Sequence, residues 1–414
     1  MEGWKKMALG DIAIKFFSGG TPSTKDSSLW DGDIQWITSK WLNGRLYLNN
    51  GEKKITEKGL ENSATKLVKA RSLILATRVG VGKVSINEID LAINQDLLGI
   101  EIDEKFYSLE FLAYQLRSEN PQDYINSFKR GATIQGVTKD CIKSIELNIP
   151  PLPEQHKIAH VLSTVQKAIE QQENLIRTTT ELKKALMQKL FTEGTRGEPQ
   201  KETEIGLVPE SWEVIHLIDV CEKPQYGFTD SAAKEGNAQF LRITDITEFG
   251  VNWNEVPFCN CPDYKNYELK NGDIVFARIG ATTGKSYLIK NPPKSVYASY
   301  LIRVRCKDKI LPEFLIYYFE TEQYWSQINA RKGDNLKGGV NGSILSKLYT
   351  PKPILDEQEQ IAGSFMILDK KIAFALSKKQ TLTALFKTLL RELMTGQRRV
   401  HDIDFEARES QTSL

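Results

Sequence analysis

The sequence predicts a mixed α/β protein in which two globular α/β domains are separated by two long helices that pair as an antiparallel coiled coil. Three observations predict this fold class. The chain of 414 residues contains an internal repeat: when the sequence is aligned with itself at an offset of 203 residues, Pro150 aligns with Pro353, and many of the residues that follow match as well. Each copy ends in about 40 residues with the apolar spacing of a coiled coil. Short β-branched runs at 73–76 and 274–277 precede those segments and are typical of buried strands. The repeat also predicts a pseudo-twofold relation between the copies.

Composition is that of a globular protein of two to three domains, with 40% apolar and 26% charged residues and a net charge of +2. The five cysteines form neither an even disulfide set nor paired CxxC motifs, so we expect reduced thiols in a cytoplasmic protein. No run of eighteen apolar residues occurs, so no membrane span is expected. The predicted order is first domain, first helix, second domain, second helix and tail, at residues 1–150, 151–196, 197–350, 351–396 and 397–414.

The globular segments correspond piece by piece. The first aligned pairs are GWKKMALGDI (3–12) with SWEVIHLIDV (211–220), and RSLILATRVGVGK (71–83) with GDIVFARIGATTGK (272–285). LEFLAYQL, from residue 109, matches PEFLIYYF, from residue 312, and both segments are expected to be helical. The copies diverge at 20–65 and 225–265. The sequence does not predict the order of the strands within each domain.

The first long helix begins in PPLPEQHKIAHVL, where Glu154 suits the positive end of the helix dipole, and Gly194 is its predicted stop. A helix of this length cannot be stable with its apolar stripe exposed, so each copy needs a partner, and the obvious partner is the other copy. Steps of three and four residues predict the side chains that pair: Ile158, Leu162, Val165, Ile169, Leu186 and Leu190 in the first helix, and Ile361, Phe365, Leu368, Ile372, Leu389 and Leu393 in the second. We call this row of pairing side chains the seam. Polar residues such as Thr179 and Lys183 interrupt the middle of the seam and can fix the register of the two helices.

Three short motifs resemble catalytic or metal-binding sites without completing one. GATTGKS, from residue 280, has three residues between its glycines where a phosphate-binding P-loop needs four. NPPK, from residue 291, ends in Lys294, where an amino-methyltransferase needs an aromatic ring to stack on a flipped base. His156 and His160 have a spacing that could hold zinc, but the HExxH glutamate is missing. We therefore expect no cofactor and no metal.

A fourth motif leaves an enzymatic alternative open. Asp263 follows a proline, and Glu268 and Lys270 follow in an E-x-K arrangement. Two carboxylates and a lysine on adjacent strands can bind Mg²⁺ and activate water. The spacing between Asp263 and Glu268 is shorter than two strands usually need, and the first domain has no counterpart. A Mg-dependent DNA nuclease remains the alternative function, and cleavage of plasmid by the chain alone would reveal it.

The order of domains and helices, with PLPEQxxIAxxL opening the first helix, resembles the specificity subunit of Type I restriction-modification enzymes. The second copy departs from the motif at Asp356, which stands where Pro153 does, and at Gly363. The resemblance implies two target-recognition domains that each bind one half of a bipartite, asymmetric site in double-stranded DNA. It implies helices that hold the domains apart and dock methyltransferase subunits, two of them, with translocase-nuclease (restriction) subunits joining. It also implies that the subunit itself has no active site.

Basic residues at equivalent positions in the two copies are the predicted phosphate contacts, because two similar domains that face one duplex would make equivalent contacts to its backbone. Residues that differ between the copies are the predicted base readers. An assembly protein whose domains bind protein instead of DNA is a third hypothesis, and Arg78 and Arg278 could also be paired to acids within their domains. The predicted phosphate contacts are Arg78, Lys83, Lys129, Arg130, Arg278, Lys285, Arg331 and Lys332, and the predicted base readers are Lys40, Arg45, Arg242 and Asp245.

Overall fold

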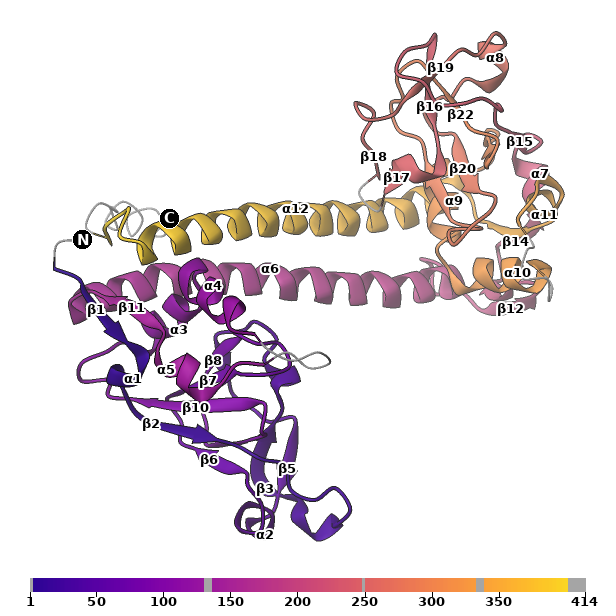
Figure 1. Cartoon of the computed structure of the whole chain (residues 1–414). Coiled ribbons are helices and arrows are strands. Elements are labelled where there is room, and N and C mark those ends of the chain that lie inside the picture. Colours follow the sequence, from indigo (N-terminus) through magenta and orange to yellow (C-terminus); the bar gives the residue numbers. More distant parts are fainter. Residues whose placement is uncertain (1–2, 130–135, 248–249, 333–338, 401–414) are drawn as a thin grey trace, which may run out of the picture. The chain divides into compact units, whose positions relative to one another are not determined.

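The computed structural model describes residues 3–129, 136–247, 250–332 and 339–400, and Figure 1 labels their elements. The chain divides into two compact units, and each long helix contributes one half to each of them. Unit 1 comprises Met1–Gln171 and Lys379–Leu414, and unit 2 comprises Gln172–Lys378. The long helices are α6 (Leu152–Glu193) and α12 (Leu355–Met394).

Unit 1 contains two sheets and a strand pair. The five-stranded sheet has the order β2 (Ala13–Ser18), β10 (Leu97–Ile102), β7 (Ser72–Ala76), β8 (Val84–Asn87) and β4 (Tyr47–Leu48). The four-stranded sheet has the order β5 (Lys53–Ile55), β3 (Trp30–Ile37), β9 (Leu91–Ile93) and β6 (Lys66–Val68), with β3 parallel to β9. β1 (Lys5–Ala8) pairs with β11 (Glu146–Ile149). The short helices are α1 (Leu9–Ile12), α2 (Glu57–Glu61), α3 (Leu109–Arg117), α4 (Glu119–Ser127) and α5 (Lys139–Lys143).

Unit 2 repeats this plan. One sheet has the order β15 (Gln225–Tyr226), β23 (Leu301–Val304), β20 (Ile274–Ala277) and β21 (Ser286–Leu288), and the other has β19 (Phe258–Cys259), β16 (Ala238–Leu241) and β22 (Ser295–Tyr297). The strand pairs are β14 (Glu213–His216) with β24 (Tyr349–Lys352), β12 (Gln200–Thr203) with β13 (Gly206–Pro209), and β17 (Ile246–Thr247) with β18 (Gly250–Val251). The short helices are α7 (Leu217–Val220), α8 (Tyr264–Tyr267), α9 (Pro312–Tyr318), α10 (Glu322–Lys332) and α11 (Gly342–Ser346).

The two units share their topology. The order β2-β10-β7-β8 corresponds to β15-β23-β20-β21, and β5-β3-β9 corresponds to β19-β16-β22. The correspondence extends to strand direction, because β16 is parallel to β22 just as β3 is parallel to β9. The internal repeat predicted from the sequence is therefore a repeat of the fold, a mixed α/β arrangement attached to two long helices.

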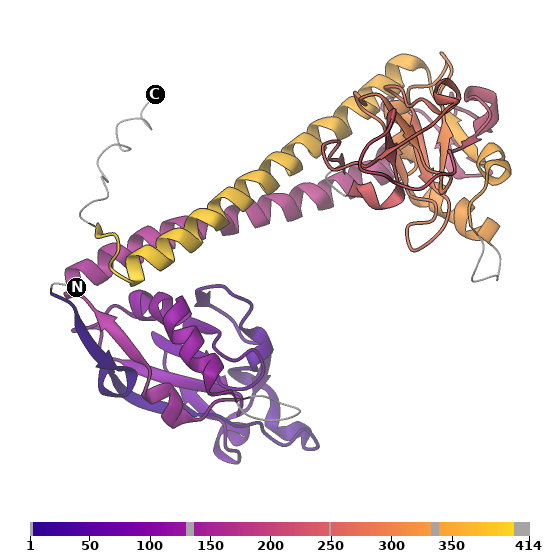
Figure 2. The ribbon, with the colours of Figure 1, turned by 45° about the horizontal axis from the view of Figure 1, so that its top comes forward.

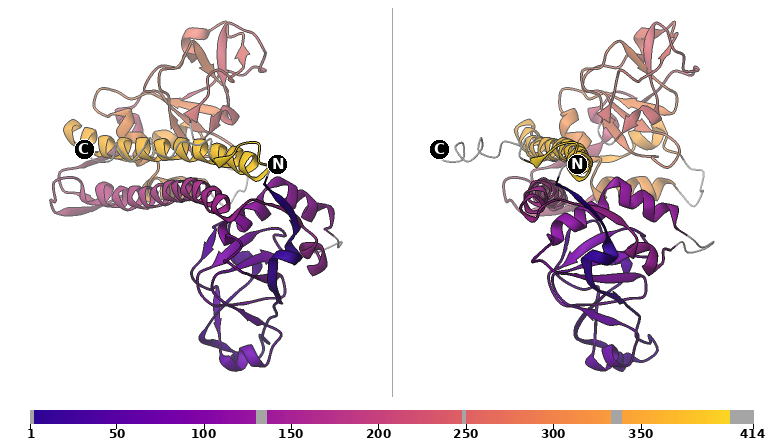
Figure 3. Two further views of the ribbon diagram at one scale, coloured as in Figure 1. Left: turned by 90° about the vertical axis from the view of Figure 1, so that its left-hand side faces the viewer. Right: turned by 60° about the vertical axis from the view of Figure 1, so that its left-hand side comes forward.

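The long helices pair antiparallel in both units. In the core of unit 1, Ile158 and Leu162 from the start of α6 join Leu389 and Leu393 from the end of α12. In the core of unit 2, the end of α6 joins Ile361 and the rest of the start of α12. The paired halves lie side by side in all three ribbon views (Figure 1, Figure 2 and Figure 3).

Each helix also buries a second face against its globular neighbours. Met187 and Phe191 are more deeply buried than the predicted seam residues Leu186 and Leu190, which are only partly buried. The ring centroid of Phe191 lies 5.3 Å from that of Phe314 on α9 and 6.2 Å from that of Phe365 on α12, so this ring packs against both the globular domain and the other long helix. Among the other predicted seam residues, Phe365 is fully buried, Ile169 is 8% exposed, and Val165, Leu368 and Ile372 are partly buried.

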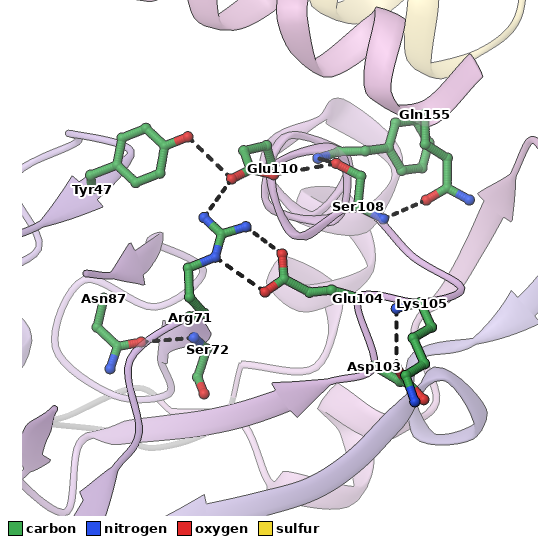
Figure 4. A network of polar contacts seen from close by, with 11 residues as sticks. Tyr47, Arg71, Ser72, Asn87, Asp103, Glu104, Lys105, Ser108, Glu110 and Gln155 are labelled. Atoms are coloured by element: carbon green, nitrogen blue, oxygen red, sulfur yellow. Dashed lines mark hydrogen bonds and ion pairs between the residues drawn. The ribbon is translucent and has the colours of Figure 1, made fainter. Parts of the chain in front are cut away.

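The repeated glutamine of the motif explains why the helix starts are alike. The side-chain oxygen of Gln155 accepts a hydrogen bond from the backbone N–H of Ser108, at the start of α3, at 2.9 Å, as Figure 4 shows. Its amide donates to the carbonyl of Pro150 at 2.9 Å. Gln358 makes the same two bonds, to the N–H of Leu311 at 2.7 Å and the carbonyl of Pro353 at 2.8 Å. Each glutamine thus ties its long helix to the helix of the adjacent globular domain.

The repeated glutamate binds the segment that follows the other long helix. Arg399 donates two hydrogen bonds to the carboxylate of Glu154, at 2.7 and 2.9 Å. In unit 2 the carboxylate of Glu357 lies 3.7 Å from Arg196 and accepts hydrogen bonds from Trp212 and from the backbone N–H of Thr195. The first-turn glutamates therefore connect the two copies, in addition to their favourable place at the helix dipole.

Candidate nucleic-acid interface

The loop that follows β7 in unit 1 and the loop that follows β20 in unit 2 are closed by the same backbone hydrogen bond. The N–H of Ala76 donates to the carbonyl of Lys83 at 2.9 Å, and that of Ala277 donates to the carbonyl of Lys285 at 2.8 Å. Both lysines are exposed. The preceding glycines, Gly82 and Gly284, adopt φ of +89° and +90°, a conformation that side chains other than glycine rarely take. Lys83 and Lys285 are thus equivalent in structure as well as in sequence.

Arg78 and Arg278, in contrast, are not equivalent, and the alignment predicted from their shared Arg-x-Gly was wrong at this point. The N–H of Val137 donates to the carbonyl of Thr77, and the N–H of Val340 donates to the carbonyl of Arg278, both at 2.9 Å. Arg278 therefore corresponds to Thr77. The reason is that the loop between β20 and Lys285 is one residue longer than its counterpart, and the extra residue lies after the arginine.

The two arginines also have different surroundings. The side chain of Arg78 is 56% exposed, and its guanidinium lies 3.9 Å from the carboxylate of Asp96, a loose ion pair. The guanidinium of Arg278 lies over the ring of Tyr226, 5.1 Å from its centroid. Tyr226 was not predicted from the sequence, because it lies in the segment 225–265, where the two copies diverge.

The second pair of predicted basic positions lies at the ends of α4 and α10. Lys129 is half-buried at the end of α4, and Arg130 lies outside the described residues. The guanidinium of Arg331 donates to the carbonyl of Lys347 at 3.1 Å and to the side chain of Gln327 at 3.3 Å, so it supports the local fold. The side chain of Lys332 is also outside the described part of the chain.

The predicted base readers follow β3 and β16, each of which leads into a 3₁₀ turn, Ser39–Trp41 and Ile243–Asp245. Lys40 and Asp245 lie within these turns, Arg242 directly precedes the second, and Arg45 follows the first. Lys40 and Arg45 are exposed. Arg242 donates to both oxygens of Asp245, at 3.0 and 2.7 Å, and this hydrogen bonding raises the pKa of Arg242 above its ordinary value. Lys40 and Arg45 are therefore available to a ligand, whereas Arg242 and Asp245 would have to exchange one partner for another.

The residues of the nuclease alternative each have a local partner in the fold. The carboxylate of Glu268 accepts a hydrogen bond from Tyr264 at 3.1 Å and lies 4.0 Å from Lys270, while Asp263 accepts from Asn266. Within the described ranges, no group of three or more histidine, cysteine, aspartate or glutamate side chains could hold a metal ion. The glycine-rich stretch around Gly284 leads into strand β21, so the helix on which a P-loop depends is replaced by a strand.

In the part of the chain that the structure covers, none of the helices has the length and apolar character needed to cross a membrane.

Comparison with known proteins gives one consistent result. The family model described as Type I restriction modification DNA specificity domain matches residues 1–177 and 209–384. The MjaVIII specificity subunit of Methanocaldococcus jannaschii is 26% identical over 416 residues, which cover 98% of this chain and 95% of the relative. The EcoKI specificity subunit of Escherichia coli K12 is 22% identical over 330 residues, which cover 75% of this chain and 71% of the relative.

A solved structure has the same fold. The S subunit of a Type I restriction-modification system from M. genitalium superposes with a TM-score of 0.66 at 16% identity, covering 94% of this chain and 96% of that one. The two family matches coincide with the two copies of the repeat that strand order and helix contacts define. The chain therefore belongs to the family of Type I restriction-modification DNA specificity subunits.

Proposed function

We propose that this chain is a non-catalytic subunit that binds a bipartite, asymmetric target in double-stranded DNA, one half-site to each globular domain. The observation that carries the proposal is the repeated scaffold with divergent side chains. Equal strand order supports two domains that approach DNA in the same way, and different loop residues support two different half-sites. The chain itself would act in the cytoplasm, where its DNA target is accessible.

The phosphate contacts in this proposal are the residues that the two domains share in structure. Lys83 and Lys285 qualify, because both the residue type and the backbone position are the same. Two lysines at equivalent places can neutralise phosphates in either half-site without reading sequence.

The long helices would dock two methyltransferase subunits, and restriction subunits would join them. Exposed apolar side chains on α12 support a protein partner, since Ile367 and Phe374 are 67% and 70% exposed. Ile367 and Phe374 are not among the residues that pair the two helices, so their exposure is not explained by the fold. Exposed apolar side chains at helical spacing are typical of interaction surfaces.

Selection of bound duplexes from a random pool, with the chain and its methyltransferase subunits together, tests the proposal. We expect enrichment of two short defined sequences separated by a gap of fixed length. If no sequence is enriched, the result favours an assembly protein whose domains bind protein. If a single uninterrupted sequence is enriched, the proposal of two half-sites is wrong. Cleavage of plasmid by the purified chain with Mg²⁺ would instead support the nuclease alternative at Asp263, Glu268 and Lys270.

The phosphate contacts have their own test. Lys83→Ala and Lys285→Ala should each weaken binding to all sequences alike and lower the salt slope by about 1, because one fewer counterion is released. Lys69→Ala is the matched control, since Lys69 is 74% exposed and precedes the opposite end of the same strand, β7. An effect of Lys69→Ala as large as that of Lys83→Ala would contradict the assignment.

A further inference from the structure

Three backbone positions around the shared loop carry unrelated side chains in the two units. In unit 2 they are Tyr226, Arg278 and Tyr300: Tyr226 pairs with Ile302 in the sheet, and the N–H of Arg278 donates to the carbonyl of Tyr300 at 2.9 Å. These residues come from the ends of two strands and from the loop after a third, so the sheet itself brings them together.

The corresponding positions in unit 1 follow from the same pairings. Ser18 pairs with Leu98, as Tyr226 pairs with Ile302. The N–H of Thr77 donates to the carbonyl of Asp96 at 2.8 Å, which matches the bond between Arg278 and Tyr300. A shared backbone therefore presents serine, threonine and aspartate in unit 1 where unit 2 presents two tyrosines and an arginine.

The side chains of unit 2 form an open aromatic and basic surface. Tyr226 and Tyr300 are 40% and 56% exposed. The hydroxyl of Tyr226 accepts a hydrogen bond from the N–H of Gly342 at 3.0 Å, which fixes the ring under the Arg278 guanidinium. Among the described residues no acid forms an ion pair with Arg278, whereas the guanidinium of Arg242 donates to both oxygens of Asp245.

The unit 1 positions present acceptors instead. The hydroxyl of Thr77 donates to the carbonyl of Asp96 at 3.1 Å, and the Asp96 carboxylate accepts from Asn94 at 3.1 Å. The Asp96 carboxylate also lies 3.9 Å from Arg78, so an acid with its own cation stands at the place of Tyr300. This position therefore differs in charge and in shape between the two domains.

We infer that Arg278 is a base-reading residue of the second domain, which donates two hydrogen bonds to a guanine in the major groove and is held in place by Tyr226. The inference rests on the proposed function. Positions where the two domains have the same residue on the same backbone are expected to contact phosphates. Positions where only the backbone is the same are expected to contact bases, because the base sequence differs between the half-sites. A planar guanidinium stacked on a ring loses little freedom on binding, and its fork matches the O6 and N7 acceptors of guanine.

Three variants in complex with the methyltransferase subunits test the inference by selection from random duplexes. Arg278→Ala should lose the preference for one guanine in one half-site and weaken binding to the selected sequence about 10- to 100-fold. Arg278→Lys keeps the positive charge but lacks the fork, so it should lose the same preference. Thr77→Ala is the control at the matched position and should leave that guanine unchanged.

The outcomes separate the two levels of the proposal. If the wild-type complex selects a bipartite sequence and Arg278→Lys selects the same one with the same affinity, Arg278 contacts phosphate and the inference is wrong. Equal weakening across all sequences with a smaller salt slope in Arg278→Ala would also mean that Arg278 contacts phosphate and would overturn the inference. If the wild-type complex selects no sequence at all, the proposed function fails and the inference fails with it.

Discussion

Replacing Glu357 tests whether the contacts that connect the two copies hold unit 2 together. The Glu357 side chain is 1% exposed, and its carboxylate accepts a hydrogen bond from the fully buried Trp212 at 3.1 Å and another from the N–H of Thr195 at 2.8 Å. Glu357→Ala would leave the indole N–H of Trp212 without an acceptor in an apolar core. Losing a charged acceptor and stranding a buried donor costs about 3–4 kcal/mol in the free energy of unfolding.

The matched residue in unit 1 provides the comparison. Glu154 binds Arg399, whose side chain is 29% exposed, and the Glu154 side chain is 15% exposed. Water can replace part of this pair, so Glu154→Ala should cost about 1 kcal/mol. Glu357→Gln keeps an acceptor oxygen for Trp212 and should cost about half as much as the alanine variant.

Calorimetric unfolding of the full chain measures the difference. For a unit of about 200 residues, 1 kcal/mol corresponds to roughly 2–4 °C in Tm. We therefore expect the unfolding transition of unit 2 to fall by about 6–16 °C in Glu357→Ala, and that of unit 1 to fall by about 2–4 °C in Glu154→Ala. Equal shifts in the two alanine variants, or equal shifts for Glu357→Ala and Glu357→Gln, would refute the reasoning.

Three further predictions concern the seam, acid and oxidation. Leu389→Asp should lower the urea midpoint of unfolding more than Leu186→Asp, because Leu389 is 7% exposed and Leu186 is only partly buried; similar midpoints would contradict this. Burial would raise the pKa of Glu110, but its hydrogen bonds to Arg71 and other neighbours outweigh burial and lower the pKa below its ordinary value of 4.5. This carboxylate therefore stabilises the fold above pH 4.5 and loses that effect as pH falls through the lowered value. Glu110→Gln should lose less stability than the wild type when the pH is lowered from neutral to well below 4.5, and equal losses would contradict this. Cys221 and Cys306 face each other across an antiparallel bridge, and contact with the Cys221 thiol and burial raise the pKa of Cys306. Because the thiolate is the reactive form, a small-molecule disulfide should oxidise the pair to a disulfide slowly, and faster at higher pH. Absence of the Cys221–Cys306 cross-link from the peptide masses after oxidation would count against this prediction.

The long helices could be predicted from the sequence because their apolar periodicity continues along most of segments that form helices of 42 and 40 residues. Ile158, Leu162, Phe365 and Leu393 are all buried, as a heptad-like spacing requires. What the spacing could not predict is the burial of Phe191, which is not among the predicted seam residues. Phe191 packs on Phe314 of α9, more than a hundred residues further along the chain, as well as on Phe365.

The candidate interface was harder to predict for a physical reason. Loop residues obey no periodicity, and one inserted residue shifted the equivalence of Arg278 from Thr77 to Arg78 in the alignment. The backbone hydrogen bonds of the strand ends decide the correct match. Likewise, nothing in the sequence distinguishes Arg242, which is bound to Asp245, from the exposed Lys40.

The hydrogen bonds between Glu154 and Arg399 join residues 245 positions apart, and this separation has a consequence during synthesis. Unit 2 is continuous from 172 to 378, so all of it emerges from the ribosome before the last segment of unit 1, which begins at 379. At about 5–20 residues per second, the first half of α6 waits roughly 10–40 s for its partner helix. The domain that is made first is therefore completed last. A chain that stops short of residue 379 would lack Leu389 and Leu393, which share a core with Ile158 and Leu162, and the incomplete core would favour binding by a chaperone or degradation.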